Sequence, residues 1–277
     1  MTAMIIDAAG VRLVANSADV GAHAAADKFF WLDILGADAA AHVPYLRQAG
    51  LEAVDIAWGL RFGQTGRMHI GGQKIRAVTW IGDRAGDLIE IHVIGRPKRL
   101  ITIWRGEAST LEDIRRQFAE RVGGFGDNVY LSAGILLQLL LGTLDNVIES
   151  FDAKLDDLRQ CMDRGPDSAD FAQLARRLQS LQSISAGFSR YSGAVRSATV
   201  GVETLPGIDH LGAAELDDYV ERVEDVEDQL YERRRWLSDI MHDFATELAE
   251  KQGEQINRPG VHAEFGLGQR RRESSKG

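Results

Sequence analysis

The chain has 277 residues, of which 44% are hydrophobic and 26% charged, the composition of an ordinary globular protein. Its formal net charge of −9 argues against a nucleic-acid partner, because phosphates require a basic face. Its single cysteine, Cys161, excludes a disulfide framework and a cysteine-based zinc site, and indicates a reducing, cytosolic setting.

Neither a secretory nor a membrane-spanning segment is predicted. Residues 1–17 contain no basic region followed by an apolar core of signal-peptide length. The most apolar stretch, residues 131–144, is interrupted by two glycines, a serine and a glutamine. A helix that spans a membrane needs about 20 apolar residues, and this stretch is shorter. We therefore expect the chain to be cytoplasmic.

Residues 1–126 predict an α/β head domain. The apolar run at 29–34 is typical of a buried strand. Helices are predicted at 38–48, with Gly50 as a cap, and at 51–62. Turn residues at 95–98 predict that the strands on either side of them are antiparallel neighbours. The strands predicted from alternating polar and apolar residues are 74–81, 88–94 and 100–104.

From Ser109 onward the sequence predicts only helices. Ser109 and Glu112 have the spacing of a capping box, and glycines at 123–126 break the helix that follows. Two long helices come next, at 129–162 with Asp127 or Asn128 as the cap, and from 167 or 168 to about 199. We interpret residues 127–200 as a helical hairpin that packs on the head.

The last predicted helix, residues 211–258, carries a heptad repeat. Apolar residues that recur every seven positions are Leu216, Val223, Leu230, Leu237 and Phe244. A repeat sustained over about four heptads is typical of a helix that packs against partner helices, so we interpret these residues as an oligomer seam. Pro259 ends the pattern, and residues 259–277 predict a polar, disordered tail.

Acidic residues are concentrated at 215–228, where eight carboxylates face one arginine. They can form the solvated face of a coiled coil, which is the usual role of charge on a helix. They can also form a surface for a hard cation, because Mg²⁺ relieves repulsion between carboxylates that are brought together. The sequence leaves both interpretations open.

No enzyme chemistry is predicted. The sequence contains no HExxH motif, no nucleophile elbow and no phosphate-binding loop of the form GxxxxGK[ST]. The glycines at 63–66 and 71–74 are not followed by an apolar helix and therefore do not indicate a nucleotide site. His69 and His92 lie in alternating, strand-like segments, where we expect structural or surface roles.

The order of these elements resembles the cytosolic part of the CorA family of divalent-cation transporters, over nearly the whole chain to Arg258. The segments that carry the resemblance are Phe30–Asp33, Gln64–Met68, Leu100–Ile103, Tyr130–Asp157 and Glu254–Arg258. The resemblance implies an α+β fold with an α/β/α sandwich head, an antiparallel or mixed sheet, and long helices that end in a stalk. It also implies a homopentamer that moves Mg²⁺, or Zn²⁺ in the ZntB-like branch, and that is gated by cations bound between cytosolic domains.

Two departures from the family pattern shape what we expect. The sequence contains no Gly-Met-Asn signature, so conduction by this chain alone is not expected. Membrane contact, at the cytosolic side of an inner or plasma membrane, would come through family members that carry pore helices. The family's Glu-Asp pair in the head falls on Ala57 and Trp58, which cannot bind a hard cation.

The resemblance places the stalk half of a regulatory Mg²⁺ site on acids near the start of the last helix. The candidate ligands are Asp217, Asp218 and Glu221, with Asp55 as a possible substitute in the head. The alternative is a soluble coiled-coil interaction or regulatory protein without a metal response, in which the same acids only solvate the helix.

Overall fold

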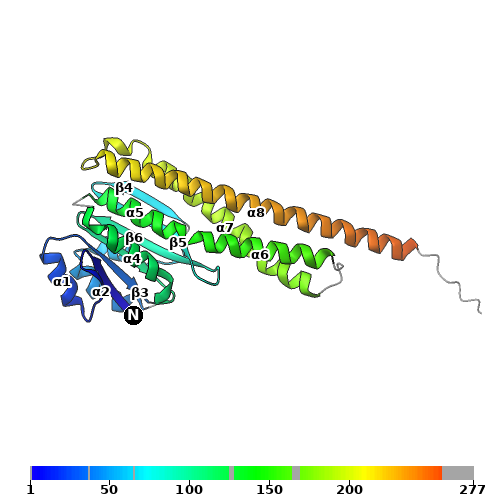
Figure 1. The fold of residues 1–277 in the computed structure, drawn as a ribbon, viewed down its shortest axis with the longest axis horizontal. Coiled ribbons are helices and arrows are strands. Elements are labelled where there is room, and N and C mark those ends of the chain that lie inside the picture. The colour runs from blue at the N-terminus through cyan, green and yellow to red at the C-terminus, as the bar shows by residue number, and fades with distance from the viewer. Residues whose placement is uncertain (1, 37, 65, 125–127, 164–168, 258–277) are drawn as a thin grey trace, which may run out of the picture.

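The computed structural model describes residues 2–36, 38–64, 66–124, 128–163 and 169–257. Strands and short helices form a head at one end, and three long helices extend away from it side by side (Figure 1). The predicted α+β class is confirmed. Residue Arg258 and the predicted tail, 259–277, lie outside the described residues, as does the proposed cap at 167 or 168.

The head is built on a mixed seven-stranded sheet in the order β2-β1-β3-β7-β6-β5-β4. The strands are β1 (Thr2–Asp7), β2 (Gly10–Leu13), β3 (Phe30–Leu35), β4 (Arg67–Gly71), β5 (Lys74–Gly82), β6 (Leu88–Arg96) and β7 (Arg99–Trp104). Strands β3 and β7 are parallel, whereas all other neighbours in the order are antiparallel. The predicted antiparallel pairing of β6 with β7 is confirmed.

Successive side chains of β3 point to opposite faces of the sheet and so belong to two separate hydrophobic cores. Leu32 and Ile34 face α1 (Ser17–Ala25), α2 (Ala39–Gln48) and α3 (Ala53–Gly59), which cover one side of the sheet. Trp31 faces the opposite side, which is covered by α4 (Glu112–Arg121) and α5 (Val129–Gly142). The three-layer α/β/α arrangement follows from this alternation.

Two local predictions about helix ends need correction, and one is confirmed. Ser109 lies inside a 3₁₀ turn, η1 (Ala108–Leu111), and α4 begins at Glu112 without a side-chain cap, so the predicted capping box is wrong. The helix expected at 51–62 is only α3, because Leu60 already ends it. Asn128 does cap α5, since its side chain accepts hydrogen bonds from the amides of Tyr130 and Leu131.

The helix predicted at 129–162 is two helices, because α5 ends at Gly142 and α6 (Leu144–Asp163) begins after the single residue Thr143. The Thr143 hydroxyl donates to the carbonyl of Leu140 at 2.6 Å and accepts from the amide of Gly82 at 2.8 Å. A Cβ at Gly82 would lie 2.4 Å from the Thr143 carbonyl oxygen, so β5 approaches the junction closely only because this residue is glycine.

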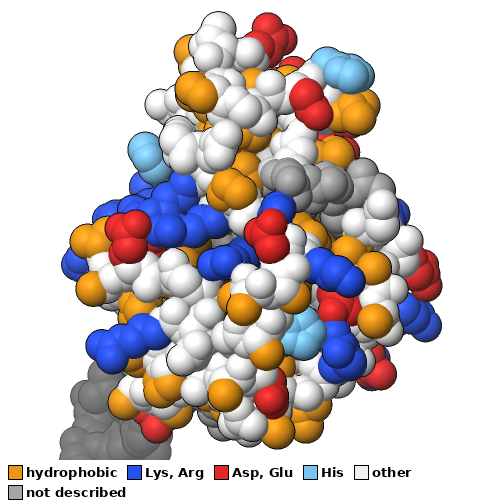
Figure 2. Space-filling model, turned by 90° about the vertical axis from the view of Figure 1, so that its left-hand side faces the viewer, with side chains coloured by type: hydrophobic (Ala, Val, Ile, Leu, Met, Phe, Trp, Pro, Cys, Tyr) orange, Lys and Arg blue, Asp and Glu red, His pale blue; other side chains and the backbone are white. Residues whose placement is uncertain are grey.

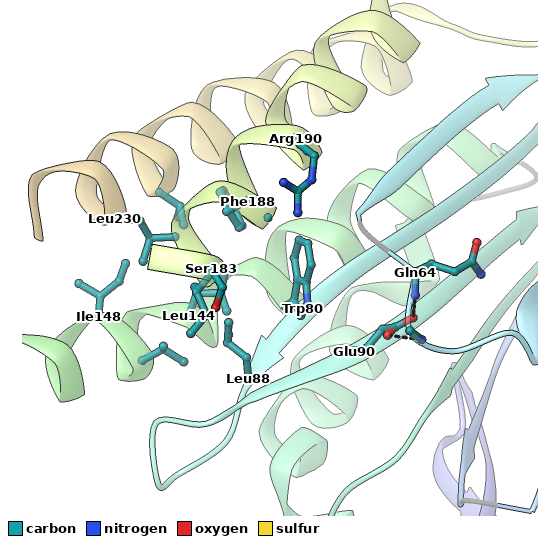
Figure 3. A pocket seen from close by; sticks show the side chains of 15 residues that line it. Gln64, Trp80, Leu88, Glu90, Leu144, Ile148, Ser183, Phe188, Arg190 and Leu230 are labelled. Atoms are coloured by element: carbon teal, nitrogen blue, oxygen red, sulfur yellow. Dashed lines mark hydrogen bonds between the residues drawn. The ribbon is translucent and has the colours of Figure 1, made fainter. Parts of the chain in front are cut away.

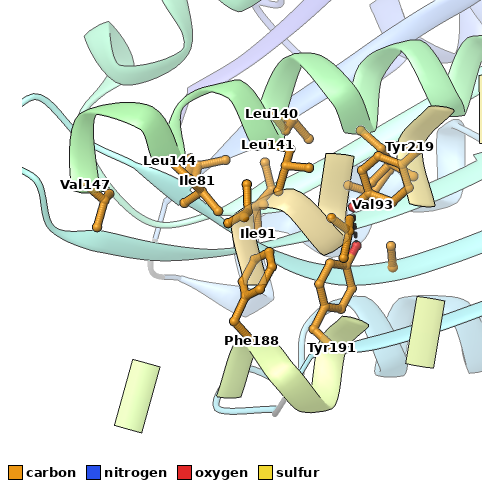
Figure 4. Packing of buried hydrophobic residues seen from close by; sticks show 14 of the residues in the cluster. Ile81, Ile91, Val93, Leu140, Leu141, Leu144, Val147, Phe188, Tyr191 and Tyr219 are labelled. Atoms are coloured by element: carbon orange, nitrogen blue, oxygen red, sulfur yellow. Dashed lines mark hydrogen bonds between the residues drawn. The ribbon is translucent and has the colours of Figure 1, made fainter. Parts of the chain in front are cut away.

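The arm consists of α6, α7 (Ala169–Thr199) and the 48-residue α8 (His210–Asn257), with the short 3₁₀ turn η3 (Val202–Thr204) before α8. Figure 4 shows how Phe188 and Tyr191 of α7 meet Tyr219 of α8 over the apolar face of β5 and β6. The hydroxyl groups of Tyr191 and Tyr219 are hydrogen-bonded to each other inside this core. The core thus runs without interruption from the sheet into the arm.

The heptad residues of α8 pack within their own chain. Leu216, Val223, Leu230 and Leu237 are at most 4% exposed, and all four belong to the core shared with the sheet, α5, α6 and α7. Their interpretation as an oligomer seam is therefore wrong, because the partner helices that the repeat requires belong to the same chain. Phe244, farther along α8, is only half-buried and packs against the edge of this core.

One described stretch, Val129–Asp163, is long and apolar enough to cross a membrane by length and composition, although no spanning segment was predicted. Core helices of other proteins meet the same criteria. Within this stretch 56% of the most apolar window is buried inside the structure, with α5 packed between the sheet and α8. Packing in the core therefore accounts for its apolar composition.

Candidate functional site

The candidate ligands Asp217, Asp218 and Glu221 lie on the outer side of α8, opposite its buried stripe. All three are exposed, and no hydrogen bond or ion pair joins them to another described residue. Their spacing follows from the helix: Leu216 and Tyr219 point into the core, so the residues between and after them face outward. The acids therefore present uncompensated negative charge to whatever approaches α8.

Two other acids of the same run are neutralised by an arginine of α7, since Arg196 approaches Glu224 at 3.1 Å and Glu227 at 3.7 Å. Arg222, the arginine within the run, is instead bound to Asp145 of α6 through two contacts of 3.0 Å. Arg196 and Arg222 therefore leave Asp217, Asp218 and Glu221 uncompensated.

Glu215, at the head end of this run, has a raised pKa. Burial is the largest cause, repulsion from Asp218 adds to it, and the charge of Arg121 opposes both. The helix is drawn close to α5 here, since a Cβ at Gly134 would lie 2.6 Å from the Glu215 side chain. Mutual repulsion between carboxylates is thus already present within one chain.

A single copy of the chain does not assemble a metal site from its described residues. Among them, no three Asp, Glu, His or Cys side chains are grouped so that they could hold an ion. Asp55 belongs to α3, which covers the sheet face opposite α8, so it is not brought together with Asp217, Asp218 and Glu221. Any cation held by the α8 acids would have to be shared with a second molecule or bound through water.

Asp55 is instead the centre of a buried cluster of basic residues. Its fully buried carboxylate binds Lys74 at 2.6 Å and also pairs with Arg76 and Arg96. Burial alone would raise its pKa, but hydrogen bonds from Lys74 and Arg96 and the charge of Arg76 outweigh burial and lower it. A metal ion would have to displace three cations, so this geometry disfavours Asp55 as a ligand.

His69 and His92 have the structural or surface roles predicted for them. His69 is exposed on β4, and His92 is buried on β6. The His92 ring bonds the carbonyl of Gly59 at 2.7 Å and the carboxylate of Glu90 at 2.6 Å. Glu90 also accepts hydrogen bonds from the amides of Gly63 and Gln64, at 2.8 and 3.3 Å.

A cleft of about 430 Å³ lies where the sheet meets the arm, and no sequence motif indicated it (Figure 3). Its walls are apolar side chains of β5, β6 and all three arm helices, together with a few polar groups. The lining residues used below are Trp80, Glu90, Gly187, Phe188 and Arg190. Its lining residues are spread along the chain from Gly63 to Leu230, which is why a local pattern could not reveal it.

Figure 2 shows the head end of the molecule, where several Lys and Arg side chains adjoin one another. The acids Asp217, Asp218 and Glu221 lie near the start of α8, which is also at the head end (Figure 1).

No protein-family model matches the sequence, and no curated protein matches it either. Solved structures do match. The complete CorA magnesium transporter from Methanocaldococcus jannaschii aligns with a TM-score of 0.69 and 13% identity, over 92% of this chain and 80% of that one. The full-length CmaX protein aligns with a TM-score of 0.64 and 16% identity over the same shares.

The cytoplasmic domain of ZntB from Vibrio parahaemolyticus RIMD 2210633 aligns with a TM-score of 0.63 and 10% identity, over 90% of this chain and 98% of that one. At these identities the comparisons establish the architecture. The chain therefore has the fold that it shares with the soluble domain of CorA, the cytoplasmic domain of ZntB and the CmaX protein.

Proposed function

We propose that this chain is the cytosolic regulatory domain of a CorA-type divalent-cation transport system, and that it acts as a homo-oligomer whose assembly responds to Mg²⁺. The observation that carries the proposal is the fold that 92% of the chain shares with a CorA magnesium transporter. Function does not follow from fold alone, so the acids of α8 must supply the chemistry.

The unpaired carboxylates supply a reason for a cation response. When two copies of α8 approach, Asp217, Asp218 and Glu221 of each copy repel those of the other. Mg²⁺ relieves that repulsion by binding carboxylate oxygens directly or through its own water shell. Because one chain lacks a three-ligand group among its described residues, the ion is held between copies. Cation binding and assembly are then coupled, so that each promotes the other.

The continuous hydrophobic core couples α8 to the head. Tyr219 and Val223 of α8 are buried against the layer that covers the sheet. A force applied to α8 by an ion between copies is therefore transmitted to the head rather than absorbed by a flexible joint.

The alternative function is an interaction or regulatory module without a metal response. Two observations favour it: Asp55 is occupied by three basic side chains, and Arg196 of α7 and Arg222 of α8 already pair with acids of neighbouring helices. In that case the outer acids of α8 only keep the helix solvated.

Thermal unfolding separates the two functions. With Mg²⁺ at millimolar concentration we expect a higher Tm than in EDTA, and the difference should grow with protein concentration because the ion is shared between copies. Sodium chloride at the same ionic strength controls for screening. Equal shifts with the two salts would support the module without a metal response.

A further inference from the structure

The cleft between sheet and arm has the size and lining of a small-molecule site. Its volume of about 430 Å³ falls within the roughly 300–1,000 Å³ range of ligand pockets. Residues of β5, β6, α6, α7 and α8 all contribute to its walls, so the cleft lies between the head and the arm. This feature is independent of the cation response proposed above.

An aromatic wall forms one side of the cleft. The Trp80 ring is held by Phe188 and Tyr191 of α7, with ring centroids 6.3 and 6.0 Å away. Gly187 of α7 also faces the ring, since an added Cβ there would lie 3.7 Å from the indole. The missing side chain at Gly187 therefore leaves part of the indole available to a flat or apolar ligand.

Two of the polar groups at the cleft already have hydrogen-bond partners within the chain. Glu90 accepts hydrogen bonds from two backbone amides and contacts His92, which compensates its carboxylate. The amide of Gln64 is turned to the carbonyls of Trp58 and Arg61, at 3.4 and 2.6 Å. Neither group needs a ligand to satisfy it.

Arg190, by contrast, has no such partner among the described residues. It lines the cleft, and no hydrogen bond or ion pair joins it to any described residue. One helical turn and a half farther on, Arg196 of the same helix pairs with two acids of α8. Figure 3 shows the guanidinium above Trp80, with Glu90 on the other side of the ring. A single free arginine beside an aromatic ring can bind a ligand that has one carboxylate for the arginine and an apolar part for the ring.

We propose that this cleft binds a small amphipathic carboxylic acid, whose apolar body lies on Trp80 and whose carboxylate pairs with Arg190. One arginine matches one carboxylate through two parallel hydrogen bonds. Binding would stabilise the packing of the arm on the head, because the ligand contacts both and the unfolded chain offers no such site.

The test uses matched probes, 2-naphthylacetate and its neutral amide, titrated into the whole chain by isothermal titration calorimetry. We expect the acid to bind about tenfold more tightly than the amide. Arg190→Gln should remove that preference, whereas Arg159→Gln, an exposed arginine of α6 outside the cleft, should keep it. Gly187→Leu, which fills the space over Trp80, should weaken both probes.

Circular dichroism and Tm show whether each variant is folded. Equal affinity of the wild-type chain for acid and amide would overturn the proposal, as would a preference for the acid that survives in folded Arg190→Gln. Octanoate and 4-phenylbutyrate extend the series to other apolar bodies. Absence of binding by all three acids at low millimolar concentration would also overturn it.

Discussion

Arg96 of β6 and Asp55 of α3 form an ion pair beneath the helix that covers this part of the sheet. Lys74 and Arg76 of β5 reach the same carboxylate, so one acid joins α3 to two neighbouring strands. The residue that the sequence marks as a substitute cation ligand thus anchors the fold. This leaves the acids of α8 as the remaining candidates for a cation response.

Asp55→Asn should lower the free energy of unfolding by about 3 kcal/mol, because three basic side chains lose the charge that compensates them in a buried setting. Urea denaturation measures the change. Glu52→Gln is the matched control: Glu52 approaches Arg96 at 3.5 Å but is 72% exposed, so its loss should cost no more than about 0.5 kcal/mol. Equal effects of the two substitutions would contradict the anchoring role.

The contribution of Asp55 should vanish in acid. Its pKa is lowered in the folded chain, so the folded state stabilises the carboxylate relative to the unfolded state. The stabilisation is complete above the ordinary value of 3.8 and is lost as the pH falls through the folded pKa. The stability difference between wild type and Asp55→Asn should therefore shrink below pH 3.8. A difference that stays constant in acid would show that charge is not its origin.

Leu237→Ala should destabilise a single folded chain rather than dissociate an oligomer. Leu237 is 4% exposed within its own chain, and its truncation should cost about 2–5 kcal/mol. Met241, four residues later and 38% exposed, provides the control Met241→Ala, which should cost much less. The loss for Leu237→Ala should be the same at low and high protein concentration. A loss that depends on concentration would restore the oligomer seam.

The hydrogen-bonded pair Tyr191 and Tyr219 should make the chain sensitive to base. Burial raises the pKa of Tyr191 to about 12 and that of Tyr219 well above the ordinary value of 10. The unfolded chain therefore releases these protons first, and stability falls as the pH rises above 10. Tyr219→Phe should reduce this fall, as followed by urea denaturation, and should cost about 1 kcal/mol at neutral pH. An unchanged alkaline profile would place the titrating groups elsewhere.

Much of the architecture could be predicted because the spacing of apolar residues reflects which side chains are buried. The strand around Trp31, the β6–β7 hairpin and the long last helix are predicted close to their observed positions. Strands β1, β2 and β4 and helix α1 were not predicted. Strands β2 and β4 lie at the two edges of the sheet, where apolar residues such as Val11 and Leu13 remain exposed, so hydrophobicity does not follow burial there. The break at Thr143 was missed because it depends on contact with Gly82, 61 residues away.

The partners of side chains could not be predicted from the sequence. A heptad repeat specifies that a helix needs partners, not whether they belong to the same chain, so Leu230 and Leu237 fit both arrangements. Asp55 resembled a free carboxylate because the strands that bring Lys74 and Arg96 to it are distant in sequence. The cleft at Trp80 and Arg190 depends on the same kind of long-range packing.

Sedimentation velocity of the whole chain in millimolar Mg²⁺ and in EDTA tests the proposed cation response most directly. We expect larger species in Mg²⁺ for the wild type. The triple variant Asp217→Asn, Asp218→Asn, Glu221→Gln should sediment identically in both buffers. The control Asp239→Asn, Asp243→Asn on the same helix should respond like the wild type. Wild-type sedimentation that is unchanged between Mg²⁺ and EDTA would show that assembly does not respond to the cation.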